Sequence, residues 1–342
     1  MLQGIQILRA LAALLVVFAH FEYIEPVIGG FGVDIFFVIS GFIMAYIVNK
    51  SPDSFLYRRI IRIVPLYYAM TFLTTGLYLV KPSWFRNVIL TPEALARSLL
   101  FIPYHIKNSG PILTLGWTLN YEMFFYVSIA LFIRIFGNKK GMIPCLAGLS
   151  IFVLISGFVS WESYEMRFWG STMIMEFVAG GILYYLWKHR LRDTTQPVKN
   201  ILILVGFSAL LFSMYAEYVF GLSVKRYLLF GIPAFLVALG FLMLENRINS
   251  KNKIHSTMVL LGDSSYAMYL VHPFVIYAFL RLVYTRTGLQ GPVYEFIGLV
   301  FSMVLVCLVS VALHRWFEKP VISLLKSLLD KRFDSQKVAV KS

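Results

Sequence analysis

Runs of apolar residues recur along almost the whole chain, with short polar connections between them. A helix needs about 20 mostly apolar residues to cross a bilayer, and about ten runs meet or approach that length. The pattern predicts an all-α polytopic membrane protein with about ten transmembrane helices. The expected spans are residues 4–22, 31–48, 62–80, 116–136, 142–160, 171–187, 200–217, 228–245, 258–282 and 295–316.

The charges of the connections predict the orientation. If the N-terminus lies in the cytoplasm, the cytoplasmic connections hold a clear excess of Lys and Arg over the outer ones. Cytoplasmic loops of membrane proteins are enriched in these residues, so we expect both termini in the cytoplasm. Residues 1–318 then form one transmembrane domain. Residues 319–342 form a basic cytoplasmic tail, expected to be a short surface helix followed by disorder.

Composition agrees with a membrane protein. The chain is 59% hydrophobic and 14% charged, with a mean hydropathy of +0.75. Its net charge of +14 does not predict a nucleic-acid partner, because the basic residues lie between apolar runs, as topology determinants do. Cys145 and Cys307 stand inside apolar runs, which predicts neither a disulfide framework nor a metal site. Residues 81–115 form the longest outer connection and contain TPEALARSLLFIP, which favours a non-spanning amphipathic helix.

Two polar side chains interrupt the first apolar run, ILRALAALLVVFAH, which holds Arg9 and His20. Their separation turns a helix through about 1,100°, about 20° past three full turns. We expect both side chains on one face, about 16 Å apart along the axis. Either they line one wall of a cavity, with Arg9 nearer the cytoplasm, or they only snorkel and cap at the two interfaces.

The second run begins within GGFGVDIFFVISGF, residues 29–42. A short loop joins it to the first run, so Asp34 is expected at about the depth of His20. Its carboxylate is a candidate to orient the imidazole and raise its basicity. The alternative is a charge stabilised only by the helix dipole. Ser40 and Gly41 lie deeper, where small residues favour helix packing over chemistry.

Three arginines, Arg58, Arg59 and Arg62, lead into the third run. At helical spacing Arg62 shares a face with each of the other two. Guanidinium groups suit the phosphates of a donor such as coenzyme A. The alternative is an anchor on the cytoplasmic side.

Three further segments hold ionisable residues. Glu122 lies well inside the fourth span, where it is expected to pair with an arginine or to shape the acceptor site. His272 lies near mid-membrane, either as a site residue or as a packed, hydrogen-bonded one, and Asp263 is expected at the start of that span. Glu318 is expected to pair with the basic loop, and Pro320 to stop or turn the last helix.

In this order, the segments resemble the integral-membrane acyltransferase family 3. The resemblance covers nearly the whole chain, and its motifs are weak singly but specific together. They are R-x10-H (Arg9, His20), GG-x-G-V-D-x-F-F-V-x-S-G-F (Gly29 to Phe42), R-R-x-x-R-I-x-P-x-Y (Arg58 to Tyr67), W-T-L-x-x-E-x-x-F-Y (Trp117 to Tyr126), S-Y-x-x-Y-L-x-H-P (Ser265 to Pro273) and E-x-P (Glu318, Pro320).

The resemblance implies a multi-pass protein of the bacterial inner membrane. It implies transfer of an acyl group, most often acetyl from acetyl-coenzyme A, from the cytoplasmic side to a sugar hydroxyl of a glycan or lipid-linked saccharide. By the same resemblance His20 is catalytic, Arg9 is essential, and Arg58, Arg59 and Arg62 are associated with the donor. No hydrolase-like domain follows the last run, so the chain is similar to the short exopolysaccharide and O-antigen O-acetyltransferases.

Two roles for His20 stay open, a general base on the sugar hydroxyl or a nucleophile that forms an acyl-histidine. Asp34 and Glu122 join it as catalytic candidates. Further site candidates are Ser265, Tyr266 and His272. A thioester carries a good leaving group, so no metal is expected.

Two rival functions are a transporter or flippase for lipid-linked saccharides and a structural partner of an export complex. A transporter would also use intramembrane charges, but the sequence has no inverted repeat.

Overall fold

Every expected span contains helix. The computed structural model describes residues 2–21, 30–50, 54–85, 88–106, 109–138, 140–220, 226–248, 251–287 and 291–339. The helices of the first half are α1 (Gln3–Ala19), α2 (Phe31–Lys50), α3 (Phe55–Val80), α4 (Pro92–Leu99), α5 (Gly116–Phe136), α6 (Met142–Ser156), α7 (Tyr164–Trp169) and α8 (Ile174–Leu186). The second half holds α9 (Gln196–Phe220), α10 (Ile232–Met243), α11 (Lys253–Asp263), α12 (Ser265–Thr287), α13 (Pro292–Leu313) and α14 (Lys319–Ala339).

In the part of the chain that the structure describes, fewer helices than the ten expected spans are both long and apolar enough to cross a membrane. Within the described residues, five helices are long and apolar enough to cross a membrane, or up to six if one bent pair is a single span. Others, such as α1 and α6, are apolar but shorter. The chain is therefore a multi-pass membrane protein, while ten spans and the side of each terminus stay predictions.

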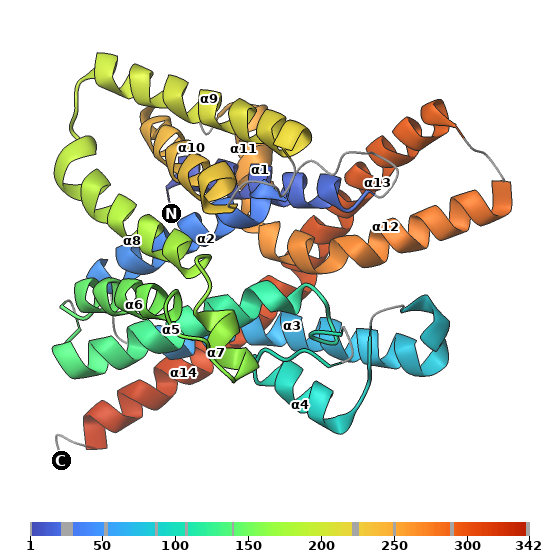
Figure 1. Ribbon diagram of the computed structural model, residues 1–342, viewed down its shortest axis with the longest axis horizontal. Coiled ribbons are helices and arrows are strands. Elements are labelled where there is room, and N and C mark those ends of the chain that lie inside the picture. The colour runs from blue at the N-terminus through green and yellow to red at the C-terminus, as the bar shows by residue number, and fades with distance from the viewer. Residues whose placement is uncertain are drawn as a thin grey trace.

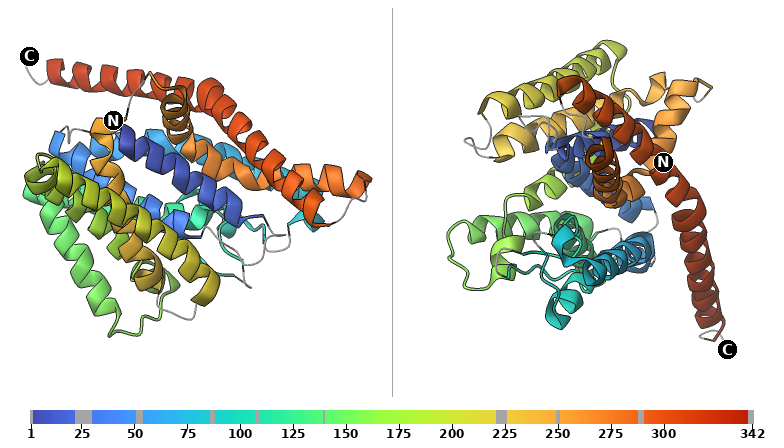
Figure 2. Two further views of the ribbon diagram at one scale, coloured as in Figure 1. Left: turned by 90° about the horizontal axis from the view of Figure 1, so that it is seen from above. Right: turned by 90° about the vertical axis from the view of Figure 1, so that its right-hand side faces the viewer.

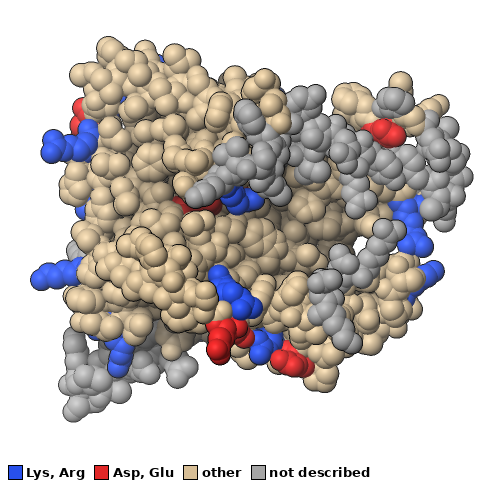
Figure 3. All heavy atoms as spheres, in the orientation of Figure 1, with Lys and Arg blue, Asp and Glu red and all other residues tan. Residues whose placement is uncertain are grey.

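Helix α2 is the centre of the bundle. It packs against α1, α5, α8 and α10, and most of its residues are buried. In Figure 1, α9 and α10 lie above α2, and α3 and α4 lie below it. Helix α1 begins and α14 ends toward the same end of the long axis, as Figure 2 also shows. Most of the face in Figure 3 carries no charged side chain, as expected of a surface that contacts lipid.

Two glycines allow α2 and α8 to pack closely. A Cβ atom at Gly41 would lie 2.0 Å from the carbonyl oxygen of Phe177, and one at Gly180 would lie 2.0 Å from that of Val38. Both distances are far below van der Waals contact, so no larger residue fits at either position. The packing role expected for Gly41 is therefore confirmed.

Two helix boundaries differ from the sequence-based expectation. Asp263 ends α11 instead of starting a span, and α12 begins at Ser265 after a bend of 76°. Pro320 does not stop the last helix. A π-helical turn over His314–Glu318 precedes it, and the chain continues as the 21-residue helix α14. Because α13, this turn and α14 form one helix over Val293–Lys331, Pro320 lies inside a helix that does not end there.

The connection over residues 81–115 holds the expected short helix, α4. Thr91 caps it by accepting a hydrogen bond from the N–H of Ala94, at 3.0 Å. Arg97 of α4 donates to the Glu165 carboxylate at 2.6 Å, which joins α4 to α7. The Ser163 hydroxyl and the Arg97 guanidinium together lower the pKa of Glu165 to about 2.

Candidate functional site

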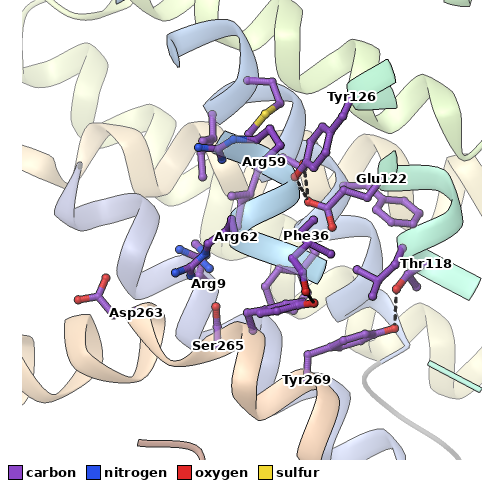
Figure 4. Close-up of a pocket in the computed structure, with 18 of the residues that line it drawn as sticks. Arg9, Phe36, Arg59, Arg62, Thr118, Glu122, Tyr126, Asp263, Ser265 and Tyr269 are labelled. Carbon is purple, nitrogen blue, oxygen red and sulfur yellow. Dashed lines mark hydrogen bonds between the residues drawn. The ribbon is translucent and has the colours of Figure 1, made fainter. Parts of the chain in front are cut away.

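A cavity of about 510 Å³ lies among α1, α2, α3, α5, α12 and α14 (Figure 4). Its lining holds five basic side chains and two carboxylates, and this excess of positive charge favours an anionic ligand. The basic residues are Arg9, Arg59, Arg62, Lys319 and Lys326, and the acidic ones are Glu122 and Asp263.

Arg9 reaches the cavity from α1 and is held there by its own helix. Its Nη1 donates to Oε1 of Gln6 at 2.9 Å, and the amide of Gln6 donates to Asp263. The other guanidinium N–H groups of Arg9 have no hydrogen-bond partner among the described residues, and Figure 4 shows Arg9 beside Arg62. Gln6 therefore positions the Arg9 guanidinium, and no salt bridge among the described residues neutralises it.

The arginines of α3 divide between two environments. Arg59 and Arg62 line the cavity, and Nη1 of Arg62 forms a salt bridge with Oε1 of Glu318 at 2.9 Å. Arg58 is outside the lining and forms an exposed salt bridge with Asp330, at 3.2 Å. The predicted group of three is thus a pair in the cavity and one residue that ties α3 to α14.

Glu318 pairs with Arg62 and with His314, instead of with a basic loop. The imidazole Nδ1 of His314 lies 2.7 Å from Oε2 of Glu318, and the π-helical turn brings these two residues together. The Glu318 side chain is 1% exposed, so its charge depends on these two partners.

Glu122 lines the cavity from α5. Its Oε1 accepts hydrogen bonds from Oγ of Ser40, at 3.1 Å, and from the hydroxyl of Tyr126. Arg59 lies close enough to interact electrostatically with both Glu122 and Tyr126. Ser40, for which helix packing was favoured over chemistry, therefore belongs to the polar wall of the cavity.

Aromatic residues form the opposite, less charged end of the cavity. The Tyr269 hydroxyl lies 2.8 Å from Oγ1 of Thr118, and Phe36 packs edge to face against the Tyr269 ring. Tyr266 also lines the cavity and donates to the carbonyl oxygen of Ile63 at 2.7 Å. The hydroxyl of Ser265 lines it as well, fully buried and without a hydrogen-bond partner in the described residues.

His20 lies beyond this end of the cavity, at the C-terminus of α1. Its Nδ1 lies 2.8 Å from the carbonyl oxygen of Val16, and because a carbonyl oxygen only accepts, Nδ1 is the donor in this hydrogen bond. The His272 ring packs edge to face against it, with centroids 4.6 Å apart. His272 in turn lies 6.1 Å from the ring of Tyr269, which connects this histidine pair to the cavity.

Asp34 is not the partner that orients His20. Its Oδ2 accepts a hydrogen bond from Nη2 of Arg226 at 2.6 Å, and its carboxyl group also contacts Glu176. Asp34 is fully buried and therefore needs this counter-charge. The three residues join α2, α8 and the start of the helix over Tyr227–Met243. The expected pairing of Asp34 with His20 is not found among the described residues, and a catalytic role for Asp34 stays a prediction.

Replacing Arg226 by alanine is expected to destabilise the fold by about 3–5 kcal/mol, because the Asp34 charge would stay buried without a partner. The measurement is thermal unfolding in detergent, with Arg190→Ala on an exposed turn as the control. Adding Asp34→Asn should restore part of the loss in a double-mutant cycle. An unchanged unfolding midpoint for Asp34→Asn, together with lost activity, would instead support the orienting role.

Several site residues carried little sequence signal. Arg226 is 192 residues from Asp34, and no spacing rule connects them. Gln6 stands one helical turn before Arg9, a relation that the sequence does contain. The sequence also contains the spacing of Lys319 and Lys326, which places these two residues on one helix face.

Comparisons with known proteins agree with the sequence motifs. Residues 2–312 match the family of the acyltransferase domain. The chain is 34% identical over 304 residues to the exopolysaccharide production protein ExoZ of Rhizobium meliloti, which covers 86% of this chain and 90% of that protein. It is 26% identical to the peptidoglycan O-acetyltransferase OatA of Listeria monocytogenes, over 78% of this chain and 48% of that protein.

A third relative is the O-acetyltransferase OatA of Staphylococcus aureus, 22% identical over 94% of this chain and 57% of that protein. The chain therefore spans about half the length of the two OatA proteins. No solved structure matches the chain significantly.

Proposed function

Because the chain belongs to the acyltransferase family that it matches over residues 2–312, we propose that it is a polysaccharide O-acyltransferase. It takes an acyl group, acetyl in our proposal, from acyl-coenzyme A and transfers it to a sugar hydroxyl of an exported or surface polysaccharide. The relatives named for exopolysaccharide production and for peptidoglycan O-acetylation support this acceptor class. The family match also favours an acyltransferase over a flippase.

One observation carries the proposal: the cavity is basic at one end and leads toward a histidine pair at the other. The phosphates of the donor bind at the end lined by Arg59 and Arg62. The thioester arm then runs past Arg9 toward Tyr269. In this account the basic end of the cavity faces the cytoplasm and the histidine pair faces outward. The protein lies in a bacterial inner membrane, and lipid contacts the helices that surround α2.

The chemistry occurs at His20. The hydroxyl oxygen of the sugar attacks the thioester carbonyl while Nε2 of His20 takes the hydroxyl proton. The carbon–sulfur bond then breaks, and the thiolate receives a proton from the imidazolium, so that ester and free thiol are the products. The hydrogen bond from His20 Nδ1 to the Val16 carbonyl supports this role, because it leaves Nε2 as the basic nitrogen.

His272 is a positioning residue in this account. Its Nδ1 bonds to the carbonyl oxygen of Met268 at 3.2 Å, and its buried ring holds that of His20 edge to face. The second possibility, attack by Nε2 of His20 on the thioester, uses the same nitrogen and forms an acyl-histidine.

The test of the function uses purified protein in nanodiscs, acetyl-coenzyme A labelled in the acetyl group, and the polysaccharide of the producing cell. We expect equal amounts of free thiol and of alkali-labile acetyl ester on the polysaccharide. A flippase would release no thiol. Thiol release without ester on the polysaccharide would contradict the proposed acceptor.

A further inference from the structure

One face of α14 forms part of the cavity. Lys319, Ile322 and Lys326 recur at helical spacing and all line it, with Ile322 buried between the two exposed lysines. One turn further along the same face, Asp330 forms the salt bridge with Arg58. Helix α14 therefore packs against α3 in a fixed register, with its lysines at the basic end of the cavity.

The lysines add positive charge where positive charge is already concentrated. Lys326 lies within electrostatic range of Arg58, Arg59 and Arg62. Among the described residues, neither Lys319 nor Lys326 forms a salt bridge, whereas Arg58 and Arg62 each have a carboxylate partner. Like charges repel at this range; Asp330 offsets part of this charge, and an anion bound among these side chains would offset more.

We propose that Lys319 and Lys326 bind the phosphate groups of the acyl donor, so that α14 is one wall of the donor site. The inference rests on the proposed function, and it assigns residues of the expected basic tail to the site itself. A compact ammonium group suits a phosphate oxygen, and two lysines beside Arg59 and Arg62 match a ligand with several phosphates. The apolar contact of Ile322 holds the helix in place between them.

Two fragments of the donor allow the phosphate groups and the reactive thioester to be tested separately. Adenosine 3′,5′-bisphosphate keeps phosphate groups and has no thioester, whereas acetyl-pantetheine keeps the thioester and has no phosphate at its end. We expect Lys326→Glu to weaken binding of the bisphosphate about tenfold and to raise KM for acetyl-coenzyme A by a similar factor. KM for acetyl-pantetheine should change less than about twofold, and kcat should be maintained.

The controls use the same helix. Lys326→Arg keeps the charge and should rescue bisphosphate binding, whereas Lys331→Glu changes an exposed residue outside the cavity lining and should have no effect. Unchanged thermal unfolding of each variant excludes a folding defect.

The outcomes separate this inference from the function itself. The inference is overturned if the wild type does not bind the bisphosphate, if Lys326→Glu binds it as tightly as the wild type, or if Lys326→Glu impairs both thioesters equally. If the bisphosphate binds through Lys326 but acetyl-coenzyme A donates no acetyl group, the proposed donor fails and the anion site stands.

Discussion

Replacing His20 by alanine is expected to lower kcat for acyl transfer about 10²- to 10⁴-fold, while donor binding stays close to that of the wild type. A positioned general base contributes about 10²–10⁴ in rate. The basic cavity that we propose as the donor site does not include His20 in its lining, so donor affinity is expected not to depend on this side chain. The measurement pairs initial rates of ester formation with equilibrium binding of adenosine 3′,5′-bisphosphate.

His105 provides a matched control, because it is another exposed histidine, stacked on Tyr164 outside the cavity. We expect His105→Ala to keep the wild-type rate. Rapid quenching of wild-type protein with labelled acetyl-coenzyme A and no acceptor separates the two mechanisms. Label that stays on the wild type through a denaturing quench near neutral pH, is released by hydroxylamine and is absent from His20→Ala would indicate an acyl-histidine. Near-normal turnover by His20→Ala would remove this residue from the mechanism.

Replacing Arg9 by alanine is expected to lower kcat/KM for acetyl-coenzyme A about a hundredfold. The loss of one or two charge-assisted hydrogen bonds costs about 1.5–3 kcal/mol each, and every 1.4 kcal/mol is about tenfold. Gln6 fixes the guanidinium in the cavity without neutralising it, so its remaining N–H groups are available to the donor. Steady-state kinetics with varied donor concentration gives the measurement.

Two variants make the Arg9 result specific. Arg9→Lys keeps the charge but loses the planar fork, and we expect it to recover only part of the activity. Arg134→Ala removes an exposed arginine of α5 outside the cavity lining and should be neutral. If kcat/KM falls as much for Arg9→Lys as for Arg9→Ala, the planar guanidinium and not the positive charge alone is required. Unchanged kinetics in both variants would exclude Arg9 from the site.

Local spacing predicted the parts of the site that lie on single helices. The phase relation placed Arg9 and His20 on one face and left open whether that face lines a cavity; in the structure Arg9 lines one. His20 shares that face by phase, but it is the residue after the end of α1 and is not among the residues that line the cavity, which include Phe36 and Tyr269. The sequence has no means of predicting where aromatic side chains from α2 and α12 meet.

Contacts between segments that are far apart in the chain could not be predicted from the sequence. Asp34 was assigned to His20 because the two lie at a similar depth, but depth does not decide which helix a side chain faces. Arg226 satisfies Asp34 from the other side of α2. The place of Lys326 in the cavity lining was missed for a different reason. Its helical spacing was visible, but nothing in the sequence indicated that α14 packs against α3.

The central claim is that the donor and the acceptor meet from opposite sides of the membrane, and one measurement tests it directly. The protein is reconstituted into sealed liposomes, with labelled acetyl-coenzyme A outside and the polysaccharide of the producing cell either trapped inside or added outside. The protein can insert in both orientations, because only molecules whose donor site faces the outside can react with the external acetyl-coenzyme A. The account predicts labelled ester only when donor and acceptor are separated by the bilayer, and none with His20→Ala. Ester formation that requires both substrates on the same side would contradict it.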